Sequence, residues 1–433
     1  MKHTNSHTVR FLFIICFSLF LTCAPRVSDI SGPRNVILII PDGCSIPAWA
    51  AVRILTAGVE GELNIDRLPV QSRARTYCAN SIITDSAAAG TALACGVKTN
   101  YGVLGMDAET VRSDSLTGHA ATSILEQAEQ AGYATGLVTT TAIQHATPAA
   151  FYTHRPDRDW MELITGDIVG KNIEVILGGG REYFIPRDTI DEEGGRSQRT
   201  DSRNLIEEMT NQGYVYVYDA AGFAAIDPSS TDRLLGLFNP GHMRYEYDRP
   251  HDRGGEPPLW EMAEKALEIL SKNERGFFLM IEAGRIDHAA HANDAIRWLW
   301  DSIACEKTVG VASAFAEAHP NTLLIVVPDH GCGGPNVIGF YESTEPDSGT
   351  LDNEAVGHIR YTLDENGFPV DFDEHPLAIG WASSPHFLRT AFGDGEHTAE
   401  DVGVHAMGPG SEGLAGLNEN TDINAVMRAH LGL

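Results

Sequence analysis

Basic residues are scarce in this chain of 433 residues. Lysine and arginine total 31 against 59 aspartates and glutamates, so the formal net charge at pH 7 is −28. No basic stripe is available to neutralise nucleic-acid phosphates, which argues against nucleic acid as a partner. The acidity fits a well-solvated exported protein and repels anions at long range. An anionic substrate would therefore need local positive charge, of the kind that bound metal ions supply.

The sequence also lacks linkers and internal repeats. No Ser/Gly-rich or Pro-rich stretch divides it, and no solenoid-type period is present. With 43% hydrophobic residues the chain can bury a large core. Residues of metal-ligand type extend from Asp42 to His397. We therefore predict one domain over residues 35–433, with insertions, rather than separate modules.

An apolar run near the amino terminus is too short for a comfortable membrane span. Residues 11–22 follow a basic start and have the length of a signal-peptide core. We predict a leader over residues 1–24, export to the periplasm or the extracellular space, and no membrane span after leader removal. A retained anchor is the alternative. Cys23 stands where a bacterial lipoprotein would be acylated, but the residues before it form a poor lipobox, so lipid anchoring stays open.

Cysteine is sparse once the leader is removed. Five cysteines remain, an odd number, so at least one thiol is unpaired in any intramolecular scheme. No CxxC pair of the metal-knuckle type occurs. Cys44 and Cys332 each lie two residues beyond a candidate ligand, Asp42 and His330. Two small buried thiols are favoured over a bridge between them.

Three continuous apolar runs end in residues of metal-ligand type. Such runs are typical of parallel strands that are buried on both faces. In sheets of this kind, ligands bind beyond the carboxyl ends of the strands. The runs and the residues that follow them are 35–40 with Asp42, 278–281 with Glu282, and 322–327 with Asp329 and His330.

The segment 282–291 adds further ligands to a strand end. After a turn, Asp287 and His291 lie four residues apart, which a helix would place on one face. A carboxylate oxygen and an imidazole nitrogen suit a zinc-like divalent ion left with an open position. The alternative is an N-capping aspartate with two surface histidines.

An Ala/Gly-rich segment, 87–94, follows the polar triplet 84–86 and predicts a tightly packed helix. In one interpretation the triplet only caps that helix. In the other, the first helical turn attracts an anion, and Ser86 attacks phosphorus after a metal lowers the pKa of its hydroxyl. The segment alone favours the cap.

Four further polar residues lie in predicted loops. His145 and Thr147 are candidate ligands or contacts to metal-bound water, although the segment alone favours a polar loop that caps the residues after Pro148. Arg158 could hold two phosphate oxygens at once, but surface arginines are common. His397 lies in a predicted turn before an acidic stretch, where a histidine is ordinarily solvated.

Taken in order, these segments resemble the alkaline phosphatase family over essentially the whole chain from Asn35. The resemblance implies a three-layer α/β sandwich, with a large, mostly parallel central sheet flanked by helices, plus insertions. It also implies hydrolysis of a broad range of small phosphate monoesters at alkaline pH, and one expected assembly is a homodimer. The matching motifs are 41–43, 84–88, 96–99, 145–150, 177–181, 282–291, 329–330 and 397–402.

The resemblance further implies two zinc ions, one magnesium ion and a phosphoserine intermediate on Ser86. Arg158 would clamp the phosphate. His145 and His288 are similar to those of animal-like and marine-bacterial-like members, where they shape metal binding and turnover. The implied ligands are Asp287, His291 and His397 for the first zinc; Asp42, Asp329 and His330, with Ser86, for the second; and Asp42, Thr147 and Glu282 for magnesium.

The chain departs from the family pattern at several positions. Pro41 replaces the usual Gly, and Cys332 stands where many members carry His, which removes a potential partner of the zinc ligands and could shift affinity or rate. The acidic segment 335–394 matches only loosely. We expect a reduced crown-like insertion there, at the pocket rim or a dimer contact.

Related activities are the main alternatives. A sulfatase needs a modifiable residue followed by x-Pro-x-Arg, which residues 86–89 do not begin. A phosphodiesterase usually has a Thr nucleophile and lacks the arginine at position 158. A non-catalytic metal-storing or phosphate-binding module is the third alternative, and the filled ligand positions argue against it.

Overall fold

The computed structural model describes residues 32–252, 255–341, 351–352, 360–382 and 395–433. The predicted leader 1–24 and Cys23 lie outside the described residues. Residues 32–433 group as one compact unit. Within the described ranges, no helix has both the length and the apolar character that crossing a bilayer requires.

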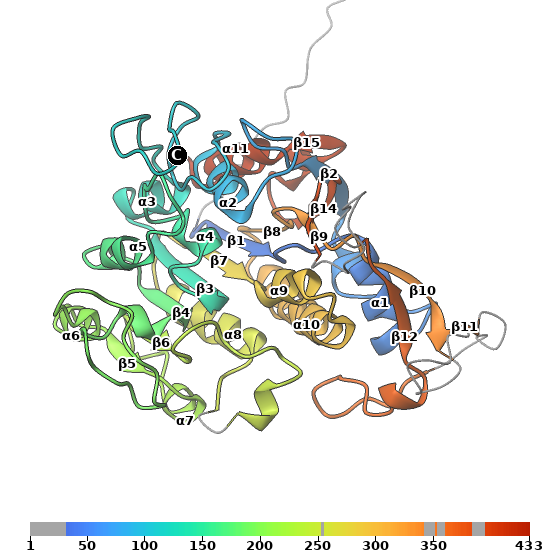
Figure 1. Ribbon diagram of the computed structural model, residues 1–433. Helices are drawn as coiled ribbons and strands as arrows, with labels where there is room; N and C mark the ends of the chain where they lie inside the picture. The colour runs from blue at the N-terminus through green and yellow to red at the C-terminus, as the bar shows by residue number, and fades with distance from the viewer. Residues whose placement is uncertain (1–31, 253–254, 342–350, 353–359, 383–394) are drawn as a thin grey trace, which may run out of the picture. The chain divides into compact units, whose positions relative to one another are not determined.

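A ten-stranded sheet runs through this unit in the order β15-β2-β14-β8-β1-β7-β3-β4-β6-β5 (Figure 1). All neighbouring pairs are parallel except the two that β14 makes, with β2 and β8. The predicted mostly parallel central sheet is therefore confirmed. The strands are β1 Asn35–Ile40, β2 Val70–Arg75, β3 Ala134–Ala142, β4 Val175–Gly179, β5 Val215–Val217, β6 Leu234–Leu237, β7 Phe277–Glu282, β8 Thr322–Val326, β14 Val402–Met407 and β15 Leu417–Glu419.

The apolar runs of the sequence form the centre of this sheet. Strand β1 lies between β7 and β8 in parallel register, and all six of its residues are buried. Ile37 and Ile39 join the core on one face, whereas Val36, Leu38 and Ile40 join the core on the other. Both faces of β1 are therefore covered, because successive side chains of a strand point to opposite faces.

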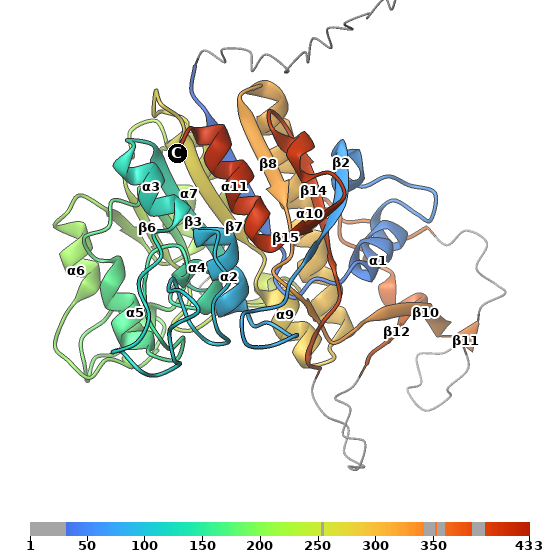
Figure 2. The same cartoon turned by 90° about the horizontal axis from the view of Figure 1, so that it is seen from above.

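Helices cover both faces, which confirms the three-layer architecture. The first core includes residues of α1, α8, α9 and α10, and the second includes residues of α2, α3, α5, α6 and α11. Figure 2 shows α11 next to α2, which it contacts. The helices are α1 Pro47–Thr56, α2 Ser86–Cys95, α3 Ile124–Gln130, α4 Ala146–Ala149, α5 Met161–Ile168, α6 Leu205–Thr210, α7 Ala220–Ala224, α8 Leu259–Leu270, α9 Arg285–His291, α10 Ala295–Ala318 and α11 Asn420–Leu431, with short 3-10 turns at 65–67, 181–183, 249–251, 372–374 and 411–414.

The predicted insertion contains a second, three-stranded sheet. Strands β10 (Asn336–Tyr341), β11 (Leu351–Asp352) and β12 (Leu377–Gly380) pair antiparallel in the order β11-β10-β12. Phe368 and Phe372, which lie between β11 and β12, pack on Trp300 of α10. Residues 342–350, 353–359 and 383–394 lie outside the described part. The expected roles of the segment remain predictions.

Two very short strands complete the fold beside the sheet ends. β9 (Gly331–Cys332) and β13 (His397–Thr398) pair antiparallel. His397 was predicted in a turn, and it is instead held in this ladder because its partner strand comes from a distant part of the chain. All five cysteines of the described residues are free and buried, so the favoured prediction of buried thiols is confirmed and Cys44 and Cys332 form no bridge.

Candidate active site

The central strands bring three predicted ligand segments together. Parallel register sets Ile40 of β1 opposite Glu282 of β7, and Ile39 opposite Val326 of β8. Asp42 and the Asp329–His330 pair follow directly after β1 and β8. Their side chains therefore meet beyond the same edge of the sheet, as the topology of parallel strands requires.

Asp42, Asp329 and His330 form a first cluster of donor atoms, all within 4.8 Å of one another. His330 Nε2 lies 3.6 Å from Asp42 Oδ1 and 3.3 Å from Asp329 Oδ2. Both of these carboxylate oxygens are buried, and neither has a hydrogen-bond partner among the described residues. Burial, then the charge of Asp287, raises the pKa of Asp329 to about 7, and burial with the charge of Asp329 raises that of Asp42. Two facing buried carboxylates and an imidazole fit a divalent cation. Its positive charge would offset the repulsion between the carboxylates.

Asp287, His291 and His397 form a second cluster. His291 Nε2 lies 3.4 Å from Asp287 Oδ2 and 3.0 Å from His397 Nε2, and His397 Nε2 lies 3.6 Å from Asp287 Oδ1. Bonds of about 2.0–2.1 Å to a tetrahedral zinc put donor atoms about 3.3–3.4 Å apart, which matches this set. The predicted placement of Asp287 and His291 on one helix face is confirmed by α9.

Backbone contacts select the histidine nitrogens that face this cluster. His291 Nδ1 lies 2.6 Å from the Gly395 carbonyl oxygen, and His397 Nδ1 lies 2.9 Å from the Thr84 carbonyl oxygen. A carbonyl accepts, so each Nδ1 carries the proton and donates it. Each Nε2 is left with a free lone pair directed at the cluster, which is the usual preparation of a metal-binding imidazole.

The third cluster consists of Asp42, His145 and Glu282. The Thr147 hydroxyl donates to Asp42 Oδ2 at 3.3 Å. One oxygen of Glu282 accepts from hydroxyls of β3, and the other is buried without a hydrogen-bond partner. The oxygen donors of this group fit magnesium, which prefers carboxylates and hydroxyl or water oxygens.

Ser86 is the first residue of α2, and Asp85 is the N-cap. The Asp85 carboxylate accepts the N–H of Ala88, so the predicted cap is present and is made by the neighbour of the predicted nucleophile. Ser86 Oγ lies 3.1 Å from His330 Nε2 and 3.4 Å from Asp42 Oδ2. The cap interpretation of the triplet thus applies to Asp85, and the nucleophile interpretation of Ser86 stays a prediction. The amino-terminal end of α2 thus lies next to the first cluster, and the positive end of its helix dipole favours an anion there.

Arg158 reaches the same place from a loop. Its Nη1 donates to Asp85 Oδ2 at 2.8 Å, and its Nη2 donates to His145 Nε2 at 3.1 Å. His145 therefore accepts, and burial together with the Arg158 charge lowers its pKa well below the usual range. These contacts hold the side chain of Arg158 in the wall of a cavity of about 590 Å³. The cavity is lined by Ile83, Ser86, Tyr101, His145, Arg158, Asp287, His288, His291, Glu396 and His397.

Some contacts around the site could not be read from the sequence. Asp85 orients Arg158, and His242, from the turn after β6, packs edge-on against His145 and His288 with ring centroids 5.3 Å and 4.6 Å apart. His242 Nδ1 accepts the Ala142 N–H at 3.0 Å. No spacing pattern in the sequence marks His242. It follows β6, and β6 does not neighbour β7 in the sheet.

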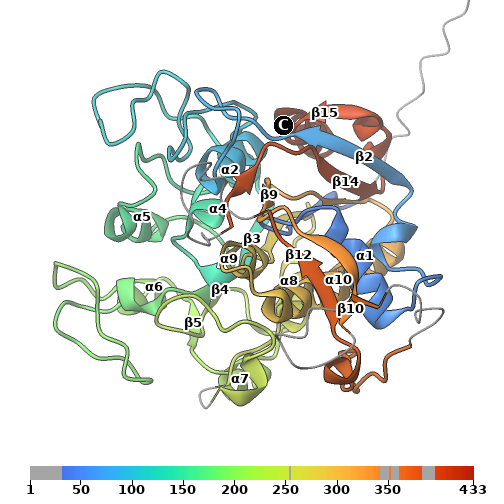
Figure 3. The ribbon, with the colours of Figure 1, turned by 45° about the vertical axis from the view of Figure 1, so that its right-hand side comes forward.

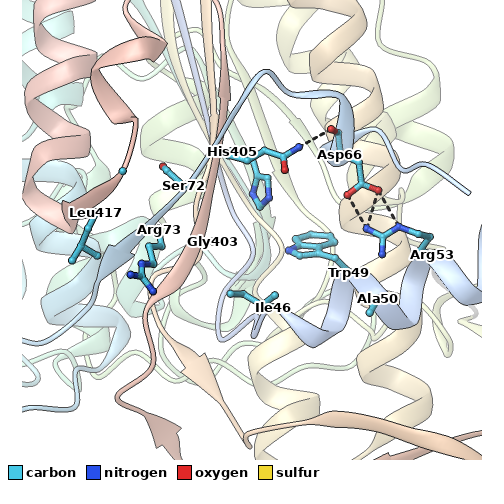
Figure 4. A pocket seen from close by; sticks show the side chains of 12 residues that line it. Ile46, Trp49, Ala50, Arg53, Asp66, Ser72, Arg73, Gly403, His405 and Leu417 are labelled. Atoms are coloured by element: carbon cyan, nitrogen blue, oxygen red, sulfur yellow. Dashed lines mark hydrogen bonds and ion pairs between the residues drawn. The ribbon is translucent and has the colours of Figure 1, made fainter. Parts of the chain in front are cut away.

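A second hollow, of about 630 Å³, lies between α1 and the strands β2 and β14 (Figure 4). Trp49 and His405 line it. The Arg53 guanidinium on its wall is paired with Asp66, with Nη2 and Oδ1 2.8 Å apart. Arg53 and Asp66 thus neutralise each other in this hollow, whereas the site at the strand ends gathers the predicted ligands.

A serine at a helix start, beside donor clusters at the ends of parallel strands, defines a class of metal-assisted hydrolases. The chain belongs to the alkaline phosphatase family, whose model matches residues 33–433. It is a phosphatase, and its family hydrolyses phosphate monoesters. The membership leaves no support for a non-catalytic module.

Named relatives agree with this assignment. The mouse tissue-nonspecific isozyme of alkaline phosphatase is 34% identical over 440 residues, covering 91% of this chain and 83% of the relative. The alkaline phosphatase of Gadus morhua is 33% identical, covering 91% of both chains. The Thermus thermophilus enzyme structure has a TM-score of 0.73 at 29% identity, covering 93% of this chain and 92% of that one. The enzyme of the Antarctic bacterium TAB5 has a TM-score of 0.70 at 25% identity, covering 92% and 98%, and variants of it hold magnesium in a site called M3.

Proposed function

We propose that this phosphatase hydrolyses phosphate monoesters through a phosphoserine intermediate on Ser86, with two zinc ions and one magnesium ion per chain held by the three donor clusters. The observation that carries the proposal is the position of Ser86 Oγ, 3.1 Å from His330 Nε2 at the start of α2, in the same cavity as Arg158.

The donor chemistry assigns a cation to each cluster. The first two clusters, which combine carboxylates with imidazole nitrogens, fit zinc, and the oxygen donors Asp42, Thr147 and Glu282 fit magnesium. When bound, the ions supply Lewis acidity that lowers the pKa of the attacking oxygen and stabilises charge on the leaving oxygen. The proposed zinc ligands are Asp287, His291 and His397 for one ion and Asp42, Asp329 and His330 for the other; the proposed magnesium ligands are Asp42, Thr147 and Glu282, with His145 and His288 tuning the metal sites.

The chain's own residues perform two in-line displacements. Ser86 Oγ first loses its proton to water and forms a bond to phosphorus while the bond to the alcohol oxygen breaks, and the leaving alkoxide takes a proton from water. A water molecule then loses a proton and attacks phosphorus from the vacated side; the Oγ–P bond breaks, Ser86 Oγ takes up a proton, and inorganic phosphate leaves. Arg158 holds two non-bridging oxygens through both steps, and the first-turn N–H groups of α2 add positive potential.

Asp85 and His145 keep Arg158 in position for these steps. Each accepts one hydrogen bond from the guanidinium, which leaves its other N–H groups for the ester. The proposed contacts of Ser86, Arg158 and the α2 N–H groups are all with the phosphoryl group, and none is with the alcohol portion of the ester. We therefore expect a broad range of monoesters, and membership of the family supports an optimum at alkaline pH; phosphodiesters or sulfate esters are the competing substrates.

The test compares wild type with Ser86→Ala, both loaded with zinc and magnesium, on p-nitrophenyl phosphate at alkaline pH. Ser313→Ala is the control, because Ser313 in α10 donates to the Val309 carbonyl and has no role in the donor clusters. We expect fast turnover in the wild type and the control, loss in Ser86→Ala, and a phosphorylated Ser86 peptide after acid quench. Faster cleavage of the bis-ester or of a sulfate ester by the wild type would overturn the proposal.

The proposal also covers location and assembly. We propose a domain over residues 35–433 behind a leader at residues 1–24, exported to the periplasm or the extracellular space. We also propose a homodimer that involves the segment 335–394. Mass spectrometry of the mature amino terminus tests the first statement, and an intact full-length amino terminus contradicts it. Light scattering tests the second, and a monomer mass contradicts it.

A further inference from the structure

Cys332 lies beside Asp287, His291 and His397, the residues of the second donor cluster. Strand register pairs Cys332 of β9 directly with His397 of β13. Directly opposed residues of an antiparallel pair project from the same face, with Cβ atoms about 4.5–5.5 Å apart. Cys332 therefore projects to the same side as a proposed zinc ligand, and the ladder itself fixes this arrangement.

Two further contacts anchor Cys332 next to α9. Its N–H donates to the Gly43 carbonyl at 3.0 Å, and its Sγ lies 3.9 Å from the carbonyl oxygen of Asp287. Figure 3 shows β9 near α9, which it contacts. The side chain is fully buried. The thiol thus has one long, weak contact and no strong polar partner among the described residues.

The sulfur belongs to the same donor group as the three predicted ligands. One donor atom from each of Asp287, His291, Cys332 and His397 lies within 4.8 Å of all the others. Bonds of about 2.0–2.3 Å to a tetrahedral zinc put donor atoms about 3.3–3.8 Å apart, so small shifts bring the sulfur into reach. Asp287 Oδ1 is buried without a hydrogen-bond partner in this group.

Of the four donor residues of this group, Cys332 alone does not line the cavity. Asp287, His291 and His397 line the cavity, whereas Cys332 does not and is shielded from solvent. A cation within this group would be held by three ligands that line the cavity and by a buried sulfur that does not line it. The direction facing the cavity is left for the ester.

We propose that Cys332 is a fourth protein ligand of the cation bound by Asp287, His291 and His397. This inference rests on the metal assignment of the proposed function. On binding, an S–metal bond replaces the S–H bond and the proton leaves to water. A thiolate makes the site softer, so it selects zinc over magnesium. With four protein ligands, the cation would accept the substrate only as a fifth ligand, because no fourth position would be open.

Spectroscopy of the cobalt(II)-loaded full-length enzyme tests this inference. Cobalt reports each ligand class separately: visible bands require only bound cobalt, whereas a thiolate-to-cobalt charge-transfer band in the near ultraviolet requires sulfur. We expect both bands in the wild type. Cys332→Ala should lose the charge-transfer band and bind zinc at least ~10-fold more weakly in competition with a chromophoric chelator.

Cys305→Ala is the matched control, because Cys305 is equally buried but lies in α10. It should retain the band and the zinc affinity. Visible bands without the charge-transfer band in wild type, with equal zinc affinity in Cys332→Ala, would overturn the inference and leave the metal assignment intact. No cobalt bound at all would overturn the metal assignment itself.

If Cys332→Ala does not fold, X-ray absorption of zinc-loaded wild type decides. One sulfur at about 2.3 Å from zinc supports Cys332 as a ligand, and only nitrogen and oxygen neighbours refute it.

Discussion

Gly43 lies between two donor clusters and tests whether their spacing controls metal binding. It follows Asp42 with a φ of +65°, and a Cβ built there would lie 2.5 Å from Asp287 Oδ1 and 2.8 Å from Asp287 Cβ. Its N–H also donates to Asp329 Oδ1 at 3.2 Å. Gly43→Ala therefore perturbs the site without changing any proposed ligand.

The structure gives the size of the perturbation. Ordinary contact begins at 3.4 Å, so the Asp287 carboxylate must retreat by 3.4 − 2.5, or 0.9 Å. Its oxygens lie 3.4 Å and 3.6 Å from the two histidine nitrogens, and this spacing is lost by such a shift. We expect zinc affinity to fall about 10–100-fold, as when contacts that orient metal ligands are removed, or about 1.4–2.8 kcal/mol.

Chelator competition measures the zinc affinity, and thermal unfolding of the metal-free protein measures the accompanying backbone strain. Gly170→Ala is the matched control: its φ is +93°, and no atom lies within 4 Å of the new Cβ. Both variants carry the left-handed strain of about 1–2 kcal/mol, and only Gly43→Ala meets Asp287. Equal zinc affinity in the two variants would refute the reasoning.

Three other predictions concern the phosphate clamp, a buried carboxyl group and the metals. Arg158→Ala should lower kcat/KM about 100-fold, since two charge-assisted hydrogen bonds contribute about 3 kcal/mol or more, whereas Arg112→Ala, whose guanidinium pairs with Asp157, should not; equal losses in both contradict the clamp. Burial raises the pKa of Glu306 from 4.5 to about 7, so the native state holds its proton longer than the unfolded state, and stability falls as pH rises through that interval. Glu306→Gln should therefore gain thermal stability relative to wild type across the same interval, and a constant difference in Tm would contradict this. Chelation should lower Tm by about 1 °C per kcal/mol of lost binding energy for a chain of this length, and zinc with magnesium should restore it; an unchanged Tm contradicts the metal assignment.

The sequence was sufficient for the features that local chemistry controls. Apolar runs that end in carboxylates predict buried parallel strands, and β1, β7 and β8 have that form because such runs satisfy both faces of a sheet. The four-residue spacing of Asp287 and His291 predicts one helix face, which α9 presents. The order of the motifs predicted the family, and the family model confirms it.

Only the tertiary structure determined which distant side chains meet. The pairing of Cys332 with His397, the contact of Asp85 with Arg158 and the packing of His242 join residues that no local period relates. Backbone carbonyls, invisible in a sequence, set which nitrogen of each histidine faces the metal cluster. Amino-acid order thus determined the elements and the ligand types, because these depend on burial and local geometry. The donor set and its spacing depend on strand register and loop closure across hundreds of residues, and these exist only once the sheet has formed.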